Sequence, residues 1–439
     1  MVELVWLVPA LPLIGFVLLL AVGNSLGEPR AGWLATTAAG ASFVVTLVVF
    51  FGLLARDSHS GERSYELVLF KWLPAGSLQV DAGFLVDPLS ITMALFVTGV
   101  GALIHLYSIG YMHGDPKYSK FFLYLNLFLF SMLMLVFGNN LVVTFLGWEG
   151  VGACSYFLIS FWHQRESAAT AGKKAFVTNR VGDWGFMVAT FAIWSALGTV
   201  TYTEIAQSPA MATATGTAIS LLLFVAAAGK SAQLPLSVWL PDAMEGPTPV
   251  SAMVHAATMV TSGVYLLVRM NNVLTDDALL IIAVVGAATA LFAALCAVAQ
   301  HDIKKVLAYS TISQLGYMFL AIGSGAYVAA IFHVITHAFF KALLFLGSGS
   351  VIHGMGDEQD MRKMGALRLA MPITAATFIV GWLAIAGVPP FAGFWSKDEI
   401  LLAAWEQHNI GPLLWGVGLV TALLTAYYMS RQVILVFFG

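Results

Sequence analysis

Apolar stretches of about 20 residues recur along the whole sequence, and they leave room for one class of fold. An α-helix needs about 20 apolar residues to cross some 30 Å of hydrocarbon. Only 10% of the 439 residues are charged and the mean hydropathy is +0.86, whereas a soluble domain carries about 25% charged residues. The sequence therefore predicts an all-α polytopic membrane protein, in which each helix satisfies its own backbone.

The apolar stretches predict thirteen membrane-spanning helices. The N-terminal stretch has no basic region and no cleavage site, so we interpret it as a retained first helix and not as a signal peptide. The last stretch but one is interrupted by Pro389 and Pro390, and it counts as one broken helix. The expected helices are 4–21, 33–54, 86–110, 118–137, 139–162, 172–196, 217–238, 250–269, 278–299, 305–323, 327–352, 371–404 and 411–436.

The chain is expected to have three parts. Residues 1–110 form N-terminal helices with an extramembrane hairpin at 55–85, where polar and apolar residues alternate around Pro74-Ala75-Gly76. Proline-broken helices near 235 and near 389 occupy corresponding positions in the two halves that follow. Paired broken helices of this kind indicate an inverted-repeat transporter, with repeats at about 118–269 and 278–436.

Basic residues separate into alternate loops. An excess of Lys and Arg in short loops marks the cytoplasmic side, so the N-terminus is expected on the non-cytoplasmic side. The residues on the basic side are Arg30, Lys117, Lys120, Arg165, Lys173, Lys174, Lys304, Lys305, Arg362, Lys363 and Arg368; the other side holds Arg56, Arg63, Lys71 and Arg269.

Lys230 is the first candidate functional residue. It follows the apolar run 219–228 and precedes Pro235 and three further prolines. An ionisable side chain inside the membrane is costly unless it faces a cavity or a partner, and a proline frees backbone carbonyls that lipid cannot satisfy. The pattern predicts a charge held at an internal aqueous site.

Glu149 lies in an apolar stretch, and Lys230 is its expected partner because a buried carboxylate needs a cation or loses its charge. Arg180 and Asp183 are three residues apart on one predicted helix, and they are expected to pair with each other and to tune the Glu149–Lys230 pair. The alternatives are a buried ion pair that only fixes helix packing and a simple interfacial salt bridge.

His333, His337 and Lys341 are spaced four residues apart, so they share about one face of a helix. Such a ladder suits proton relay, because histidine titrates near physiological pH. His255 is expected to connect Lys230 to this ladder. The alternatives are satisfied core histidines and a zinc site, although the glutamate of HExxH and a third ligand are missing.

Lys397, with Asp398 and Glu399, follows the second proline break. Three adjacent charges would not lie in lipid, so they are expected in a cavity. Lys397 and Asp398 complete the predicted proton path.

Several cofactor sites are excluded by the sequence. A phosphate loop GxxxxGK[ST] would need glycine where Phe224 stands. Cys154 and Cys296 are the two cysteines, too few for an iron–sulfur cluster. Energy for moving ions must then come from another subunit or from an ion gradient.

Six segments carry a resemblance to a known family. They are FLGWEGVGACSYFLI, KAFVTNRVGDWGFM, GKSAQLPLSVWLPDAMEGPTPVSAMVHAATMVTSGVYLL, DIKKVLAYSTISQLGYMFLA, HAFFKALLFLGSGSVIH and GFWSKDEIL. In this order they closely resemble the L-type subunits of proton-translocating NADH:quinone oxidoreductase, respiratory complex I, and the related Mrp antiporters. The resemblance extends from about residue 85 to the C-terminus.

The resemblance implies two inverted five-helix repeats, helices 4–8 and 9–13, with helices 7 and 12 broken. L-type subunits usually continue into a long lateral helix, whereas this sequence stops at Gly439, so it is either a fragment or a short homologue. By motif, Glu149 and Lys230 match the family's paired glutamate and half-channel lysine, Lys341 its central lysine, Lys397 its distal lysine, His255, His333 and His337 its connecting histidines, and Arg180 and Asp183 its supporting charged residues.

The expected function is an antiporter-like membrane subunit of a complex I-type enzyme in the cell inner (cytoplasmic) membrane, translocating protons beside other antiporter-like subunits. The chain itself would bind no cofactor; NADH, flavin, iron–sulfur clusters and quinone would belong to partner subunits. The alternatives are an Mrp-type cation/proton antiporter subunit, a subunit of an inorganic-carbon uptake complex, and a structural subunit without transport. The sequence leaves open whether the ion is H⁺ or Na⁺.

Overall fold

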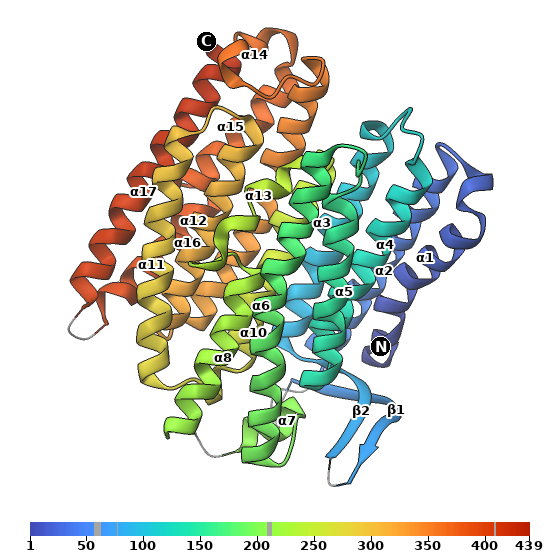
Figure 1. Cartoon of the computed structure of the whole chain (residues 1–439), viewed down its shortest axis with the longest axis vertical. Coiled ribbons are helices and arrows are strands. Elements are labelled where there is room, and N and C mark those ends of the chain that lie inside the picture. Colours follow the sequence, from blue (N-terminus) through green and yellow to red (C-terminus); the bar gives the residue numbers. More distant parts are fainter. Residues whose placement is uncertain (57–62, 77, 209–212, 408–409) are drawn as a thin grey trace.

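The computed structural model describes residues 1–56, 63–76, 78–208, 213–407 and 410–439, and it shows a bundle of helices with one hairpin at its end (Figure 1). Ten helices among these residues are long and apolar enough to cross a membrane, judged by length and composition. The all-α polytopic fold is thereby confirmed. The count of thirteen spans and the inverted repeats remain predictions.

The N-terminal part consists of helices α1 (Leu7–Leu26), α2 (Arg30–Leu54) and α3 (Pro88–Tyr111), with a short 3-10 turn at Val2–Trp6 before α1. Strands β1 (Tyr65–Ala75) and β2 (Leu78–Val86) form an antiparallel hairpin before α3. The predicted hairpin is confirmed for these strands, and residues 57–62 of the predicted stretch lie outside the described residues. Figure 1 shows the hairpin and the N-terminus at one end of the bundle and the C-terminus at the other.

The next helices are α4 (Tyr118–Phe137), α5 (Leu141–Ile159), α6 (Glu166–Leu197), the short α7 (Tyr202–Gln207) and α8 (Ala214–Lys230). Asn140 begins α5 by accepting from the backbone N–H groups of the first turn. The prediction of a helix to residue 238 is wrong, because α8 ends at Lys230 and Pro235 cannot continue a helix.

Short elements follow α8, and they correct a second prediction. 3-10 turns cover Leu236–Trp239 and Asp242–Glu245, and the expected helix 250–269 is broken into α9 (Thr248–Ala252), a π-helical turn (Met253–Ala257), a 3-10 turn (Met259–Thr261) and α10 (Ser262–Arg269). Such π turns are frequent at functional sites. His255 lies within this one.

After a 3-10 turn at Asn271–Val273, the second half contains α11 (Asp276–Ala299), α12 (Ile303–Gly323), α13 (Tyr327–Gly354), α14 (Leu367–Ala370), α15 (Pro372–Ala386), α16 (Ala392–Trp405) and α17 (Gly411–Val433), which continues into a π turn at Ile434–Phe438. A further 3-10 turn covers Met361–Lys363. The gap between α15 and α16 confirms the predicted break at Pro389 and Pro390.

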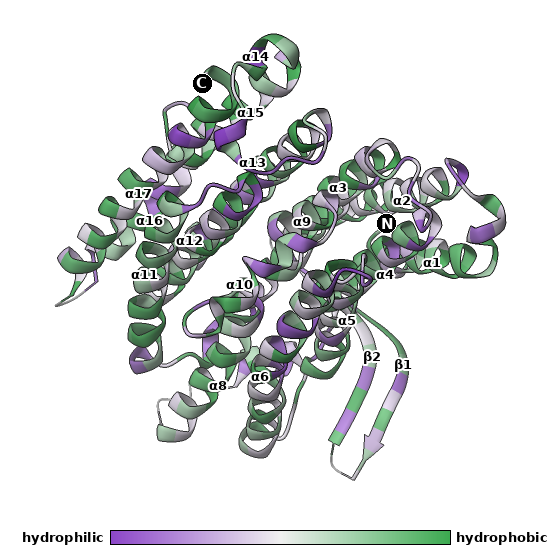
Figure 2. Cartoon of the chain, turned by 45° about the horizontal axis from the view of Figure 1, so that its top comes forward, coloured by the Kyte–Doolittle hydropathy of each residue, from purple (hydrophilic) through white to green (hydrophobic). Residues whose placement is uncertain are grey.

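Hydropathy follows this architecture. Figure 2 shows α11, at the edge of the bundle, as mainly hydrophobic, whereas polar segments occur around α9 and α10. Many polar side chains there are buried, among them Ser231, Gln233, Thr258, Thr261 and Gln314. The interior of the bundle is therefore polar at the level of the first helix break.

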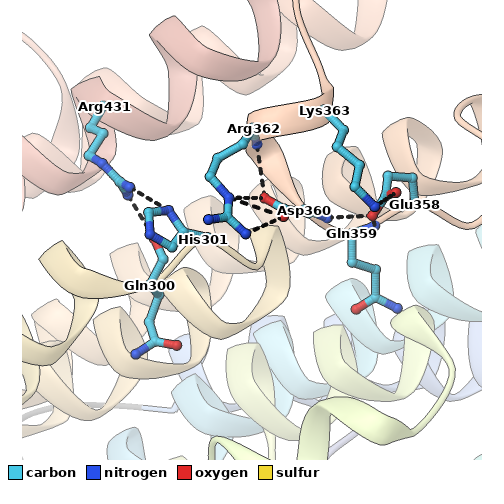
Figure 3. A network of polar contacts seen from close by, with 8 residues as sticks. All are labelled: Gln300, His301, Glu358, Gln359, Asp360, Arg362, Lys363 and Arg431. Carbon is cyan, nitrogen blue, oxygen red and sulfur yellow. Dashed lines mark hydrogen bonds and ion pairs between the residues drawn. The ribbon is translucent and has the colours of Figure 1, made fainter.

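The loops at the C-terminal end are tied together by polar contacts (Figure 3). Arg431 of α17 donates to the carbonyl of Gln300 at 2.7 Å, and the backbone N–H of Met361 donates to the carbonyl of His301 at 2.9 Å. In the same loop the Arg362 guanidinium holds the pKa of Asp360 well below its usual range. The ends of α11, α12 and α17 are thus fixed to the α13–α14 loop.

Candidate functional site

The first buried charges are brought together by a close crossing of α6 and α8. A Cβ added to Gly229 would lie 2.9 Å from the Cα of Gly182, so the two helices meet backbone to backbone at this pair, as small residues allow. Each glycine is followed by a charged residue. The Nζ of Lys230 consequently lies 3.3 Å from Oδ1 of Asp183, with 1% of the Lys230 side chain exposed.

The expected direct pair of Glu149 with Lys230 is wrong in this structure. The ion-pair partner of Glu149 is Arg180, whose Nη1 also lies 3.8 Å from Oδ2 of Asp183. Asp183 is therefore the direct acid of Lys230, because it lies on the helix that crosses at the glycines. The predicted Arg180–Asp183 contact within one helix is present.

Trp148 completes this group and was missed by the sequence analysis. Its Nε1 donates to Oδ1 of Asp183 at 2.7 Å, and the Lys230 ammonium lies 5.6 Å from its ring centroid. A buried tryptophan needs an acceptor for its N–H. The position of Trp148 next to Glu149 in an apolar stretch could therefore have indicated a buried carboxylate nearby. We call Trp148, Glu149, Arg180, Asp183 and Lys230 the Lys230 cluster.

The outer edge of the Lys230 cluster lies on an exposed apolar face. The Arg180 side chain is 45% exposed and that of Glu149 21%. Their neighbours on α6, Val177 and Trp184, are also exposed. A charged pair thus lies on a surface of membrane-facing character.

Lys341 is fully buried at the centre of α13. Its ammonium donates to the carbonyl of Leu307 at 3.1 Å and contacts the hydroxyl of Ser310. Both partners come from α12, and no sequence pattern singled out Ser310. The His337 ring, one turn earlier on α13, has neither nitrogen hydrogen-bonded to a described residue.

His333 connects α13 to the second broken helix. Its Nδ1 lies 2.8 Å from the hydroxyl of Ser396, which also contacts Thr336 at 3.2 Å. The neighbouring Lys397 is buried and donates to the carbonyl of Ile385 at 2.5 Å. Ser396, which the sequence analysis did not single out, therefore lies between the histidine ladder and Lys397.

Asp398 and Glu399 do not share this position. Both are exposed, whereas Lys397 is 4% exposed. The expectation of three charges in one cavity is wrong, because successive residues of a helix point in different directions.

The structure thus brings the remaining candidates into two groups. One is the Lys230 cluster, and the other, which we call the Lys341 row, consists of His255, His333, His337, Lys341, Ser396 and Lys397. Within the described residues no three His, Cys, Asp or Glu side chains are placed to hold a metal ion.

Buried ionisable groups at the breaks of membrane helices are typical of ion-transporting membrane proteins. The chain belongs to the NADH:quinone oxidoreductase/Mrp antiporter family, whose transmembrane description matches residues 138–425. Residues 72–122 match the N-terminus of chain 5 of NADH-ubiquinone oxidoreductase (complex I).

Curated relatives support the same family. The chain is 53% identical to NADH-quinone oxidoreductase subunit L of Mycobacterium tuberculosis, covering 99% of this chain and 69% of the relative. It is 46% identical to subunit L of Escherichia coli, covering 98% and 70%. The resemblance to L-type subunits is confirmed, and with it the interpretation as an antiporter-like membrane subunit.

Solved structures agree on the fold. The Mrp complex from Dietzia contains a chain 30% identical, with a TM-score of 0.85 over 98% of this chain, which spans 47% of that chain. The archaeal membrane-bound sulfane sulfur reductase matches at 23% identity, also with a TM-score of 0.85, covering 99% of this chain and 88% of that one. At this identity the second likeness concerns the fold alone.

Proposed function

We propose that this chain translocates protons as a non-redox subunit of a complex I-type NADH:quinone oxidoreductase, with electron transfer in other subunits. The observation that carries the proposal is the position of Lys230. A lysine 1% exposed, at a helix break inside the membrane, with its ammonium 3.3 Å from a carboxylate, is costly to keep and indicates an ion path.

Arg180 gives this arrangement a means of switching. Its guanidinium contacts both Glu149 and Asp183, so it competes with Lys230 for the Asp183 carboxylate. When Arg180 turns to Asp183, the acid is less available to Lys230, and the lysine releases its proton more readily. When Arg180 pairs with Glu149 alone, Asp183 holds Lys230 in its charged form.

The Lys341 row would carry the proton onward. His337 and Lys341 stand one turn apart on α13, and His333 reaches the second broken helix through Ser396. Lys397 of α16 is then the last group, and its ammonium lies beside the carbonyl of Ile385 in the last turn of α15. The row leads sideways through the bundle from one broken helix to the other.

The exposed charges of the Lys230 cluster support a partner subunit on that side. Arg180 and Glu149 lie on a face with exposed Val177 and Trp184, and charged groups facing lipid are costly. A neighbouring antiporter-like subunit covering α5 and α6 would remove this cost. NADH, flavin, iron–sulfur clusters and quinone would belong to further subunits.

The expected location is the inner membrane of a bacterium, with the N-terminus and hairpin on the non-cytoplasmic side. The arrangement supports this orientation, because the basic residues Arg165, Lys304 and Lys305 line one cavity at the end opposite the hairpin.

A second candidate function is that of an Mrp-type cation/proton antiporter subunit, favoured by the 30% identity to the Dietzia chain. Affinity purification of the tagged chain from its own membranes separates the two. Copurification with subunits that contain flavin and iron–sulfur clusters is expected. Copurification with small membrane subunits alone, together with Na⁺-dependent proton movement without NADH, would establish the second candidate instead.

A further inference from the structure

A large polar cavity opens at the end of the bundle that carries the basic loops. Its volume is about 940 Å³, and its wall includes Tyr111, Arg165, Glu245, Lys304 and Ile352. We call it the loop cavity. The first turns of α6 also line it, through Glu166, Ser167 and Thr170. The path of Lys230, Lys341 and Lys397 makes no use of this cavity.

A seam between α9 and α13 begins at this cavity. The hydroxyl of Tyr111, on the cavity wall, lies 3.0 Å from that of Thr248, the first residue of α9. Thr248 packs directly on α13, because a Cβ added to Gly349 would lie 3.1 Å from its methyl group. The two helices therefore meet next to the cavity wall.

The seam leads from there to His255. Thr248, Ser251 and His255 are spaced by three and four residues, so they share one face over about 10 Å of helix. On α13, Ile352 at the cavity is one turn from Ser348, and Phe345 packs on the His255 ring at 5.0 Å between centroids. Polar groups thus follow both walls of the seam.

These polar groups lack protein partners. The hydroxyls of Ser251 and Ser348 and both nitrogens of His255 are buried and form no hydrogen bond with any described residue. Buried polar groups in proteins are almost always hydrogen-bonded, either to protein or to ordered water. Several unpartnered groups in one line between a cavity and a histidine therefore indicate a file of water molecules.

We propose that a water-filled inlet runs from the loop cavity along the α9–α13 seam to His255, and that it delivers protons directly to the Lys341 row. The existence of the inlet does not depend on the proposed function, whereas the delivery of protons through it does. Thr248, Ser251 and Ser348 are positioning residues for the water file. The inlet would then refill the Lys341 row, while Lys230 remains required as the switch that controls proton movement along it.

The inlet itself is tested by cysteine accessibility in the assembled complex. In a chain carrying Cys154→Ala and Cys296→Ala, either Ser251→Cys or Ser348→Cys introduces a thiol of similar size. Inverted membrane vesicles are exposed to Ag⁺, and thiols that escape the ion are then alkylated after denaturation and counted by peptide mass spectrometry. The control is Thr46→Cys on α2, a buried hydroxyl that donates to the carbonyl of Ser42.

Both seam thiols are expected to react at least about tenfold faster than the control, since buried thiols without water access are inert. Reaction as slow as that of Thr46→Cys at both positions would overturn the inlet. This readout does not depend on whether the chain pumps protons.

Proton delivery is tested by a triple variant, Thr248→Val, Ser251→Ala and Ser348→Ala, against Thr46→Val. We expect proton uptake per NADH oxidised to fall severalfold in the triple variant and to stay normal in the control. Fast Ag⁺ reaction with normal pumping in the triple variant would overturn delivery through the inlet. Pumping that also survives loss of Lys230 would instead contradict the proposed function.

Discussion

The two broken helices hold their lysines in different ways. Lys230 is the last residue of α8, and its ammonium pairs with the carboxylate of Asp183. Lys397 lies on α16, after its break, and its ammonium reaches back to the carbonyl of Ile385 in the last turn of α15. Among the described residues it forms no ion pair.

Both amines nevertheless lie at the C-terminal end of the first half of a broken helix, where the helix dipole favours a cation. The difference is the acid partner. The charge state of Lys230 can be switched by a small movement, because a carboxylate lies nearby and an arginine competes for it. Lys397 is held by a carbonyl and by the Tyr317 ring at 5.6 Å, so its charge state changes only when its wider surroundings change. The comparison suggests that Lys230 is the regulated end and Lys397 the outlet.

The largest effect is expected from Lys230→Met. Coupled pumping should fall more than about tenfold, since the charge at the helix break is lost, while NADH oxidation partly persists. Fluorescence quenching by a pH-sensitive dye in vesicles, with NADH consumption recorded in parallel, measures both. Lys174→Met is the control, because the one ion pair of Lys174 among the described residues is exposed and joins it to Asp242. A normal proton-to-NADH ratio in Lys230→Met would contradict the proposed function.

Asp183→Asn is expected to impair pumping more than Glu149→Gln, because Asp183 is the direct acid of Lys230 and Glu149 acts through Arg180. The same dye assay on both variants checks the order. If Glu149→Gln impaired pumping more than Asp183→Asn, the result would favour the direct Glu149–Lys230 pair that the sequence predicted.

Stability should also separate the two lysines. Removing Lys230 leaves the buried Asp183 with only part of its compensation, from Arg180 at 3.8 Å and the Trp148 N–H. Breaking a buried pair costs about 3–5 kcal/mol when the remaining charge has no other partner, so the loss here should be measurable but smaller. Lys397→Met leaves no buried carboxylate without its partner among the described residues. The unfolding temperature of this variant complex should therefore lie within a few degrees of that of the unchanged complex. Thermal denaturation followed by intrinsic fluorescence makes the comparison, and equal losses for both lysines would contradict it.

A smaller effect is expected from Gly229→Ala. The added methyl group would meet the Gly182 backbone at 2.9 Å, and overpacking of this kind costs about 1–3 kcal/mol. The lysine and the acid both remain but move apart, so pumping should fall while the complex still assembles. Gly416→Ala on α17 is the control, because an added Cβ there meets no atom of the described residues within 4 Å. Matching behaviour of the two variants would mean that the crossing does not position Lys230.

The smallest effect concerns the loop far from both lysines. Hydrogen bonds from Lys363 and the loop backbone lower the pKa of Glu358, and those of Arg362 lower the pKa of Asp360. A group whose folded pKa is depressed stabilises the fold above its unfolded pKa and loses this contribution as the pH falls. Proteolysis of the α13–α14 loop should therefore accelerate slightly below about pH 4, and less so in Asp360→Asn, which has already lost that contribution.

Much of the candidate site could be predicted, because charges inside apolar stretches are visible in a sequence. Lys230, Lys341 and Lys397 were found in this way, and all three are buried. Ser310 and Ser396 could not be found, because a serine in a membrane helix is common and only its contact with a lysine or histidine distinguishes it.

The sequence by itself determined the membrane class, the hairpin, the two proline breaks and the residues too costly to bury without a use. These follow from local composition and from the fixed chemistry of proline. The tertiary structure alone decided the partners. Asp183 is the acid of Lys230 because α6 and α8 cross at Gly182 and Gly229. Asp398 is not part of the buried Lys341 row because α16 directs its side chain to the exposed surface. Partner choice depends on how helices far apart in the chain pack, which no local pattern encodes.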